Sequence, residues 1–176
     1  MKNGDIIIRK VKESDGYEWM KLVNKVWRDA YKHIFPEQVF IDKEKNIEKK
    51  VATFPETIKN DTQNIAYVAE FNGKIIGIMC GSINSRYEYF KKEYADLNAV
   101  YIDPNYQGKG IGSSFKNIFE KWAKENGATA YVIGVLKDNN KARKVYESWG
   151  GKISDYESDF VKLGVSYTEV FYVYDL

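Results

Sequence analysis

Glycine recurs at every second position in one short segment, Gln107-Gly108-Lys109-Gly110-Ile111-Gly112-Ser113. The apolar residues 97–102 before this segment predict a strand, and the residues after it predict an amphipathic helix. The first backbone amides of a helix have no acceptor within the helix, and the helix dipole makes that end positive. Glycines let a ligand approach the backbone closely. The segment therefore predicts an anion site, with phosphate or pyrophosphate favoured, to which the side chains of Gln107 and Lys109 add contacts.

Two common phosphate-binding motifs fit the glycine segment poorly. A Walker loop requires G-x-x-x-x-G-K-[ST], and the chain has no such sequence. A dinucleotide fingerprint would place Ser113 at its third glycine, and the next strand ends in Val135-Leu136-Lys137, without an acidic residue. The plain alternative is a glycine-rich turn without a ligand. The position between a strand and a helix favours the ligand loop.

Cysteine and histidine chemistry is narrowly limited in this chain. The 176 residues include one Cys and one His. A disulfide within the chain and a Cys/His metal site are therefore excluded, and we expect no metal cofactor. A Ser-His-Asp or Cys-His mechanism would depend on His33 alone. The function must come from other groups.

Composition sets the class of protein. Lys and Arg number 27 against 25 Asp and Glu, for a net charge of +2, which argues against a dedicated nucleic-acid partner. Hydrophobic residues make up 44%, so disorder is not expected. No apolar stretch approaches the roughly 18 residues of a membrane span. We expect one soluble, cytoplasmic domain over residues 1–176, with no membrane partner, and leave open whether it forms a homodimer.

Periodicity predicts the elements that must position the glycine segment. The expected order is β-α-α-β-β-β-α-β-α-β-β, which indicates an α/β (α+β) fold with a mixed sheet and helices on its faces. Ser14-Asp15 is the expected N-cap of the first helix, and Asn72-Gly73 is a strong hairpin turn. The expected ranges are a strand at 6–11, helices over about 16–31 and 37–59, a hairpin at 65–82, a strand at 97–102, a helix at 111–125, a strand at 130–136, a helix at 140–149 and a hairpin at 152–162 and 167–174.

Two motifs carry a resemblance to a known family. The run Val100 to Ser113 resembles the acetyl-CoA signature of the GNAT superfamily of N-acetyltransferases, a strand followed by [Q/R]-x-x-G-x-[G/A] and a helix. The run Asn139 to Gly150 resembles the family's N-x-x-A-x-x-[FY]-Y-E-x-x-G-F helix, with Val145 and Gly151 in place of its two usual aromatics. The resemblance covers nearly the whole chain and implies a mostly antiparallel, splayed sheet.

A shorter match lies near the N-terminus. The runs 27–31 and 35–37 are similar to a branch of the family that includes bacterial polyamine acetyltransferases. This similarity makes Trp27 and Tyr31 candidate substrate residues.

The resemblance implies transfer of an acetyl group from acetyl-CoA to a primary amine by direct attack. Backbone amides of the glycine segment would hold the pyrophosphate, and the edge of the strand near Val100 would pair with the pantetheine amides. The Val100 N–H would meet the thioester oxygen as charge develops. The cofactor-binding residues expected on this basis are Val100, Tyr101, Ile102, Gln107, Gly108, Lys109, Gly110, Ile111, Gly112, Ser113, Asn139 and Ala142.

Two catalytic residues are expected. Tyr146 lies where the family has a Tyr that protonates the leaving thiolate, and a phenol suits that leaving group. The alternative is a mid-helix packing residue. Asp96 is the first candidate for the general base, with Glu93 behind it, and the alternative is that both are solvated charges on a polar loop. Tyr87 and its neighbours either line an acceptor pocket or serve packing.

Three functional readings remain. We favour acetyl transfer to a small amine, with polyamines ahead of other amines. Transfer to a protein N-terminus or a lysine side chain is the nearest alternative. A non-catalytic acyl-CoA-binding module is the third reading, although such a module has no need of a thiolate acid at Tyr146.

Overall fold

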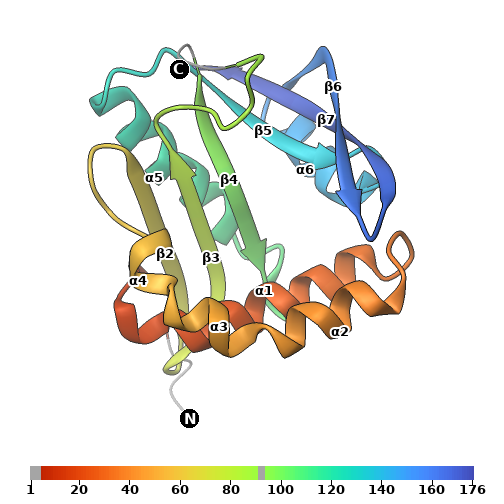
Figure 1. Cartoon of the computed structure of the whole chain (residues 1–176). Coiled ribbons are helices and arrows are strands. Elements are labelled where there is room, and N and C mark those ends of the chain that lie inside the picture. Colours follow the sequence, from red (N-terminus) through yellow and green to blue (C-terminus); the bar gives the residue numbers. More distant parts are fainter. Residues whose placement is uncertain (1–4, 91–93) are drawn as a thin grey trace.

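A twisted sheet of seven strands, in the order β1-β2-β3-β4-β5-β7-β6, organises the part of the chain that the computed structural model describes, residues 5–90 and 94–176 (Figure 1). The strands are β1 (Ile7–Lys10), β2 (Asn64–Phe71), β3 (Lys74–Ser82), β4 (Ala95–Ile102), β5 (Ala130–Leu136), β6 (Lys152–Lys162) and β7 (Val165–Asp175). The helices are α1 (Gly16–Tyr31), α2 (Glu37–Lys45), α3 (Ile47–Ala52), α4 (Phe54–Thr57), α5 (Ile111–Glu125) and α6 (Asn140–Ser148). The mixed sheet and the expected element order are confirmed, except that the polar helical stretch 37–59 is three short helices.

The pairing between β4 and β5 is short. It is the parallel pair in the sheet, and within the described residues its register contains only Ala95 with Tyr131 and Asp96 with Val132. Beyond this point β4 stays paired with β3 as far as Ile102, and β5 stays paired with β7 as far as Leu136. The two strands diverge from their N-terminal ends, as Figure 1 shows. The edge of β4 over 97–102 is therefore open toward β5, as the expected splay required.

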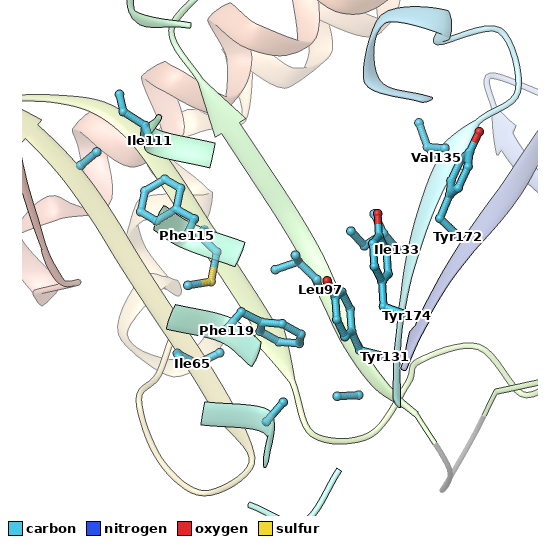
Figure 2. Close-up of a cluster of buried hydrophobic side chains, with 14 of the residues drawn as sticks. Ile65, Leu97, Ile111, Phe115, Phe119, Tyr131, Ile133, Val135, Tyr172 and Tyr174 are labelled. Carbon is cyan, nitrogen blue, oxygen red and sulfur yellow. The ribbon is translucent and has the colours of Figure 1, made fainter. Parts of the chain in front are cut away.

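Helices cover both faces of the sheet. α5 buries Ile111, Phe115, Phe119 and Ala123 at four-residue intervals, so one stripe of this helix meets the sheet. They belong to one cluster with Leu97 of β4 and the tyrosines of β5 and β7, in which Figure 2 labels Ile111, Phe115 and Phe119. α1 covers the opposite face with a separate cluster. That cluster contains Trp19, Leu22, Val26, Phe54, Ala66, Val68 and Ile78.

Local backbone signals are well matched by the structure. Asn72 and Gly73 have φ of 49° and 75°, and Leu163 and Gly164 have 49° and 76°, values that fit the two-residue turns of both predicted hairpins. α5 ends at Asn126 and Gly127, where the Gly127 N–H donates to Lys124 O at 3.0 Å. These elements follow from residues adjacent in sequence.

Asp15 holds the expected N-cap position of α1, but its side chain does not act as a cap. It is the last residue of a single 3-10 turn before α1, and it makes no capping hydrogen bond to that helix. Its carboxylate instead accepts hydrogen bonds from Arg9 Nη1 at 2.7 Å, Arg9 Nη2 at 2.9 Å and the Lys12 N–H at 2.7 Å. Arg9 Nε also donates to Glu70 at 2.9 Å. Asp15 and Arg9 together thus connect β1, the start of α1 and β2.

The charge state of Asp15 couples this contact to pH. Burial alone would raise the pKa of Asp15, but the hydrogen bonds from Arg9 and Lys12 outweigh burial and lower it below the ordinary 3.8. A carboxyl with a lowered pKa stabilises the fold above its unfolded pKa, and this stabilisation is lost as pH falls through the folded value.

We predict that Asp15→Asn lowers the free energy of unfolding by about 2 kcal/mol at pH 7, because it removes the charge that Arg9 and Lys12 bind. The difference from the parent protein should shrink as pH falls below the ordinary carboxyl pKa. Urea denaturation at neutral and acidic pH measures both effects. Glu18→Gln, at an exposed carboxylate of α1, is the control. A difference that stays constant with pH would contradict the ionic account.

Candidate active site

A cavity of about 410 Å³ lies beside the open edge of β4. It is bounded by β4, the glycine segment, α6 and α1, which are far apart in sequence. All the expected cofactor-binding residues line it except Lys109. The lining residues are Val26, Asp29, Ala30, Tyr31, Val100, Tyr101, Ile102, Tyr106, Gln107, Gly108, Gly110, Ile111, Gly112, Ser113, Asn139, Lys141, Ala142, Val145, Tyr146 and Trp149.

The glycines of the segment serve two different purposes. Gly108 and Gly110 have φ of 74° and 80°, in the left-handed region where a side chain is strained. Gly110 is the residue before α5, so this conformation directs the chain into the helix. At Gly112 the reason is space, because a Cβ atom would lie 3.1 Å from the ring of Trp149. Together they place the unpartnered first amides of α5 at the cavity wall, which suits an anion.

Asn139 links the two sides of the cavity. Its Oδ1 accepts a hydrogen bond from the Ala142 N–H at 3.2 Å, which caps α6. Its Nδ2 donates to the hydroxyl of Tyr31, on α1, at 3.3 Å. The side chain is 9% exposed. Asn139 therefore fixes α6 and α1 relative to each other.

Tyr146 lies on α6 and lines the same cavity. Burial raises the pKa of its phenol, and the neighbouring phenols of Tyr31 and Tyr174 raise it further. Within the described residues its hydroxyl makes no hydrogen bond. The phenol is therefore protonated at neutral pH, and its proton is not engaged elsewhere.

A second cavity, of about 550 Å³, adjoins the first. Tyr31 and Tyr101 line both cavities, so the two meet at these side chains. Trp27 Nε1 donates to the hydroxyl of Tyr101 at 3.0 Å and thus orients it. The lining residues of the second cavity are Trp27, Tyr31, Arg86, Tyr87, Glu88, Asn98, Tyr101, Gly134, Val135, Leu136, Tyr156, Ser158, Asp159, Phe160 and Glu169.

The sequence identified part of this second cavity. Trp27 and Tyr31 were expected as substrate residues and line it, and Tyr87, for which pocket lining and packing were both open, lines it as well. Arg86 and Glu169 were missed. The signal for Glu169 was present in the strand pattern. Glu169 lies two residues before the buried Phe171, so both side chains lie on the same face of β7. A charged residue at a position that the alternation assigns to the interior is the signal.

Asp96 does not line either cavity. Its side chain is fully buried where β4 still pairs with β5, and it accepts a hydrogen bond from the Arg86 N–H at 3.3 Å. Burial raises its pKa to about 6, although the Arg86 charge opposes this shift. The structure thus places Asp96 behind Arg86, out of contact with an acceptor. Glu93 lies outside the described residues. His33 is exposed, in the turn after α1, and lines neither cavity.

Two further findings concern groups of residues. Among residues 5–90 and 94–176, no group of three His, Cys, Asp or Glu side chains is arranged to hold a metal ion. No helix in the same residues is long and apolar enough to cross a membrane.

Comparisons with known sequences point to one family. A sequence model described as the acetyltransferase (GNAT) family matches residues 19–151. A Methanocaldococcus jannaschii protein described as an uncharacterized N-acetyltransferase is 27% identical over 145 residues, which are 81% of this chain and 59% of that protein. N-acetylaspartate synthetase of Xenopus tropicalis is 30% identical over 86 residues, 49% of this chain and 30% of that protein. The chain thus spans about three fifths or less of the length of these curated relatives.

Solved structures share the fold. PaiA N-acetyltransferase from Thermoplasma acidophilum, solved in complex with coenzyme A, aligns with a TM-score of 0.70 at 20% identity, covering 98% of this chain and 99% of that one. A GCN5-related N-acetyltransferase structure from Rhodopseudomonas palustris aligns with a TM-score of 0.73 at 15% identity, covering 100% and 99%. At these identities the likeness concerns the fold.

We predict that Asn139→Ala lowers the free energy of unfolding by about 1 to 2 kcal/mol, because it removes the α6 cap and the bond to Tyr31. Asn139→Asp should cost less, since an aspartate keeps the capping acceptor and loses only the donor. Chemical denaturation measures both. Asn140→Ala, at the exposed next residue, is the matched control. Equal losses for Asn140→Ala and Asn139→Ala would contradict the assigned cap.

Proposed function

The chain belongs to the acetyltransferase (GNAT) family, and from this premise we propose that it transfers the acetyl group of acetyl-CoA to a primary amine of a small molecule. The observation that carries the proposal is the early end of the β4–β5 pairing. This divergence leaves a strand edge open beside the N-terminus of α5, and it joins a cofactor-sized cleft to a second, polar cavity.

The first cavity suits acetyl-CoA. Its pyrophosphate would accept hydrogen bonds from the amides at the start of α5, where the helix dipole favours negative charge. The amide groups of pantetheine would extend the sheet along 99–102 of β4. Ala142 is small and lines the cavity, so a chain can lie against α6 there. The proposal assigns no contact to Lys109, which lies outside the lining.

The chain supplies two groups for direct transfer. The Val100 N–H, on the diverging part of β4, is proposed to stabilise the charge that develops on the thioester oxygen. Tyr146 is proposed to donate its phenolic proton to sulfur as the carbon–sulfur bond breaks. The buried, protonated state of Tyr146 supports this role.

The second cavity suits a cationic acceptor. Its lining includes the carboxylates of Asp159 and Glu169 and the guanidinium of Arg86. A carboxylate in the lining attracts an ammonium group. We therefore propose a polyamine-like acceptor. A cytoplasmic, single-domain protein without nucleic-acid partners stays a prediction from sequence, and a homodimer stays open.

We predict that acetyl-CoA raises the melting temperature of the protein with an affinity in the micromolar range, and that ATP does not. Binding to the folded state at 100 times Kd stabilises it by about 2.7 kcal/mol, which a thermal-shift titration detects. A thiol-release assay over spermidine, amino acids, aminoglycosides and peptides then identifies the acceptor. Stabilisation by ATP without acetyl-CoA would contradict the proposal, and thiol release with peptides alone would favour a protein acceptor.

We predict that Tyr146→Phe lowers kcat by at least about tenfold, because only a proton donor is lost. The thermal shift produced by acetyl-CoA should be unchanged, since the ring remains in the cleft. Steady-state kinetics with the preferred amine measure the effect. Tyr17→Phe, at an exposed tyrosine of α1, is the control. Normal turnover of Tyr146→Phe would assign Tyr146 to packing.

A further inference from the structure

Glu169 is a carboxylate in the lining of the second cavity. Its Oε1 accepts a hydrogen bond from the Tyr87 hydroxyl at 2.8 Å, and its Oε2 accepts one from Ser158 Oγ at 3.3 Å. Among the described residues, no Lys, Arg or His nitrogen lies within 4.0 Å of either oxygen. Neutral hydroxyl groups therefore orient the carboxylate without an ion pair that would neutralise it.

Gly134 of β5 makes room for this arrangement. A Cβ atom at Gly134 would lie 2.6 Å from the Tyr87 hydroxyl oxygen and 2.7 Å from Glu169 Oε1. Real Cβ atoms do not approach so closely, so only glycine lets the pair rest against the strand. Glycine within a strand weakens it, and a close approach by other groups is the usual reason for its presence.

Tyr87 is held by a second contact. Arg86 Nη2 donates a hydrogen bond to the Tyr87 hydroxyl at 2.9 Å. The hydroxyl oxygen thus accepts a hydrogen bond from Arg86 and donates one to Glu169. Arg86 Nε lies 3.6 Å from Asp96. Burial raises the pKa of Tyr87, so the phenol keeps its proton. Asp96 is therefore linked to Glu169 through Arg86 and Tyr87.

Glu169 lines the second cavity together with Tyr31 and Tyr101, which also line the first. Burial raises the pKa of Tyr31, the hydrogen bond from Asn139 opposes this shift, and the charge of Glu169 adds to it. Of the other lining carboxylates, Asp159 is exposed on the hairpin and accepts a hydrogen bond from Ser166 Oγ at 2.6 Å.

We propose that Glu169 binds the ammonium group of the acceptor and removes the proton that must leave before attack. This inference rests on the proposed acetyl transfer and deepens it. An N–H bond of the ammonium breaks, an O–H bond forms on Glu169, and the electron pair stays on nitrogen. The carbon–nitrogen bond then forms as the carbon–sulfur bond breaks.

The remaining protons balance. Tyr146 gives its proton to sulfur, and the new amide nitrogen loses its second proton, which restores the phenol. Glu169 releases its proton to solvent. The overall reaction converts one ammonium and one thioester into one amide, one thiol and one free proton, with no other reactant.

We predict that Glu169→Gln lowers kcat/KM for the preferred amine by about 10²-fold or more near neutral pH. Glutamine keeps the volume and can accept the Tyr87 hydrogen bond, but it cannot take a proton. The deficit should shrink as pH rises toward the amine's own pKa of about 10, because free amine then reaches the site without a base. The thermal shift produced by acetyl-CoA should not change. Kinetics between pH 6 and 10 measure the profile.

Two further variants sharpen the test. Glu157→Gln is the matched control, because Glu157 neighbours Ser158 on β6, is exposed, pairs with Lys137 at 2.8 Å and lines neither cavity. It should react like the parent protein. Tyr87→Phe removes a hydrogen bond that orients the Glu169 carboxylate, so kcat/KM for the amine should fall while the thermal shift produced by acetyl-CoA stays unchanged. Parent-like kinetics of Tyr87→Phe would contradict the orienting role of Tyr87.

The outcomes separate the inference from the proposed function. Parent-like kinetics of Glu169→Gln, or a deficit of the same size at every pH, would overturn the role of Glu169 in proton removal while acetyl transfer stands. A parent protein that neither is stabilised by acetyl-CoA nor releases thiol with any amine would overturn both.

Discussion

The parallel pairing of β4 with β5 ends after two register pairs, and the site depends on this one feature. A strand in the middle of a sheet ordinarily satisfies its amide groups on both sides. β4 does so with β3 along its length, but on the β5 side its backbone beyond Asp96 is left for another partner. The open edge and the glycine segment that follows it then form one continuous surface. The proposed use of acetyl-CoA requires no more than this backbone geometry and the end of a helix.

A charged residue is buried at the point where β4 and β5 begin to diverge. Asp96 is fully buried there, and its pKa rises to about 6 because burial penalises its charge. The positive charge of Arg86 partly compensates for the charge of Asp96, and Arg86 also donates a hydrogen bond to the Tyr87 hydroxyl. A chain of polar contacts that starts at a buried carboxylate stabilises a fold little unless each member is satisfied. The contacts from Asp96 to Glu169 meet that condition, and they give the second cavity a carboxylate of fixed orientation.

Tyrosine is abundant in the chain, with 14 residues, and the structure divides them by task. Tyr131 and Tyr174 stack at 4.4 Å between ring centres within the core under α5 (Figure 2). Tyr31 and Tyr101 line both cavities and Tyr146 lines the first, and burial raises the pKa of each. These side chains build apolar walls and still present hydroxyl groups to a reaction. A single residue type thus serves both packing and chemistry.

The sequence alone determined the elements whose signals are local. The two hairpin turns, the glycine segment and the end of α5 were predictable, because each depends on residues within a few positions. The lining of the first cavity followed from two such motifs. Only the tertiary structure decided that Asp15 binds Arg9, that Asp96 lies behind the site and that Glu169 lines it. The places of Asp96 and Glu169 depend on how far β5 and β7 turn away from β4. That angle is set by packing among residues distant in sequence, which no short pattern records.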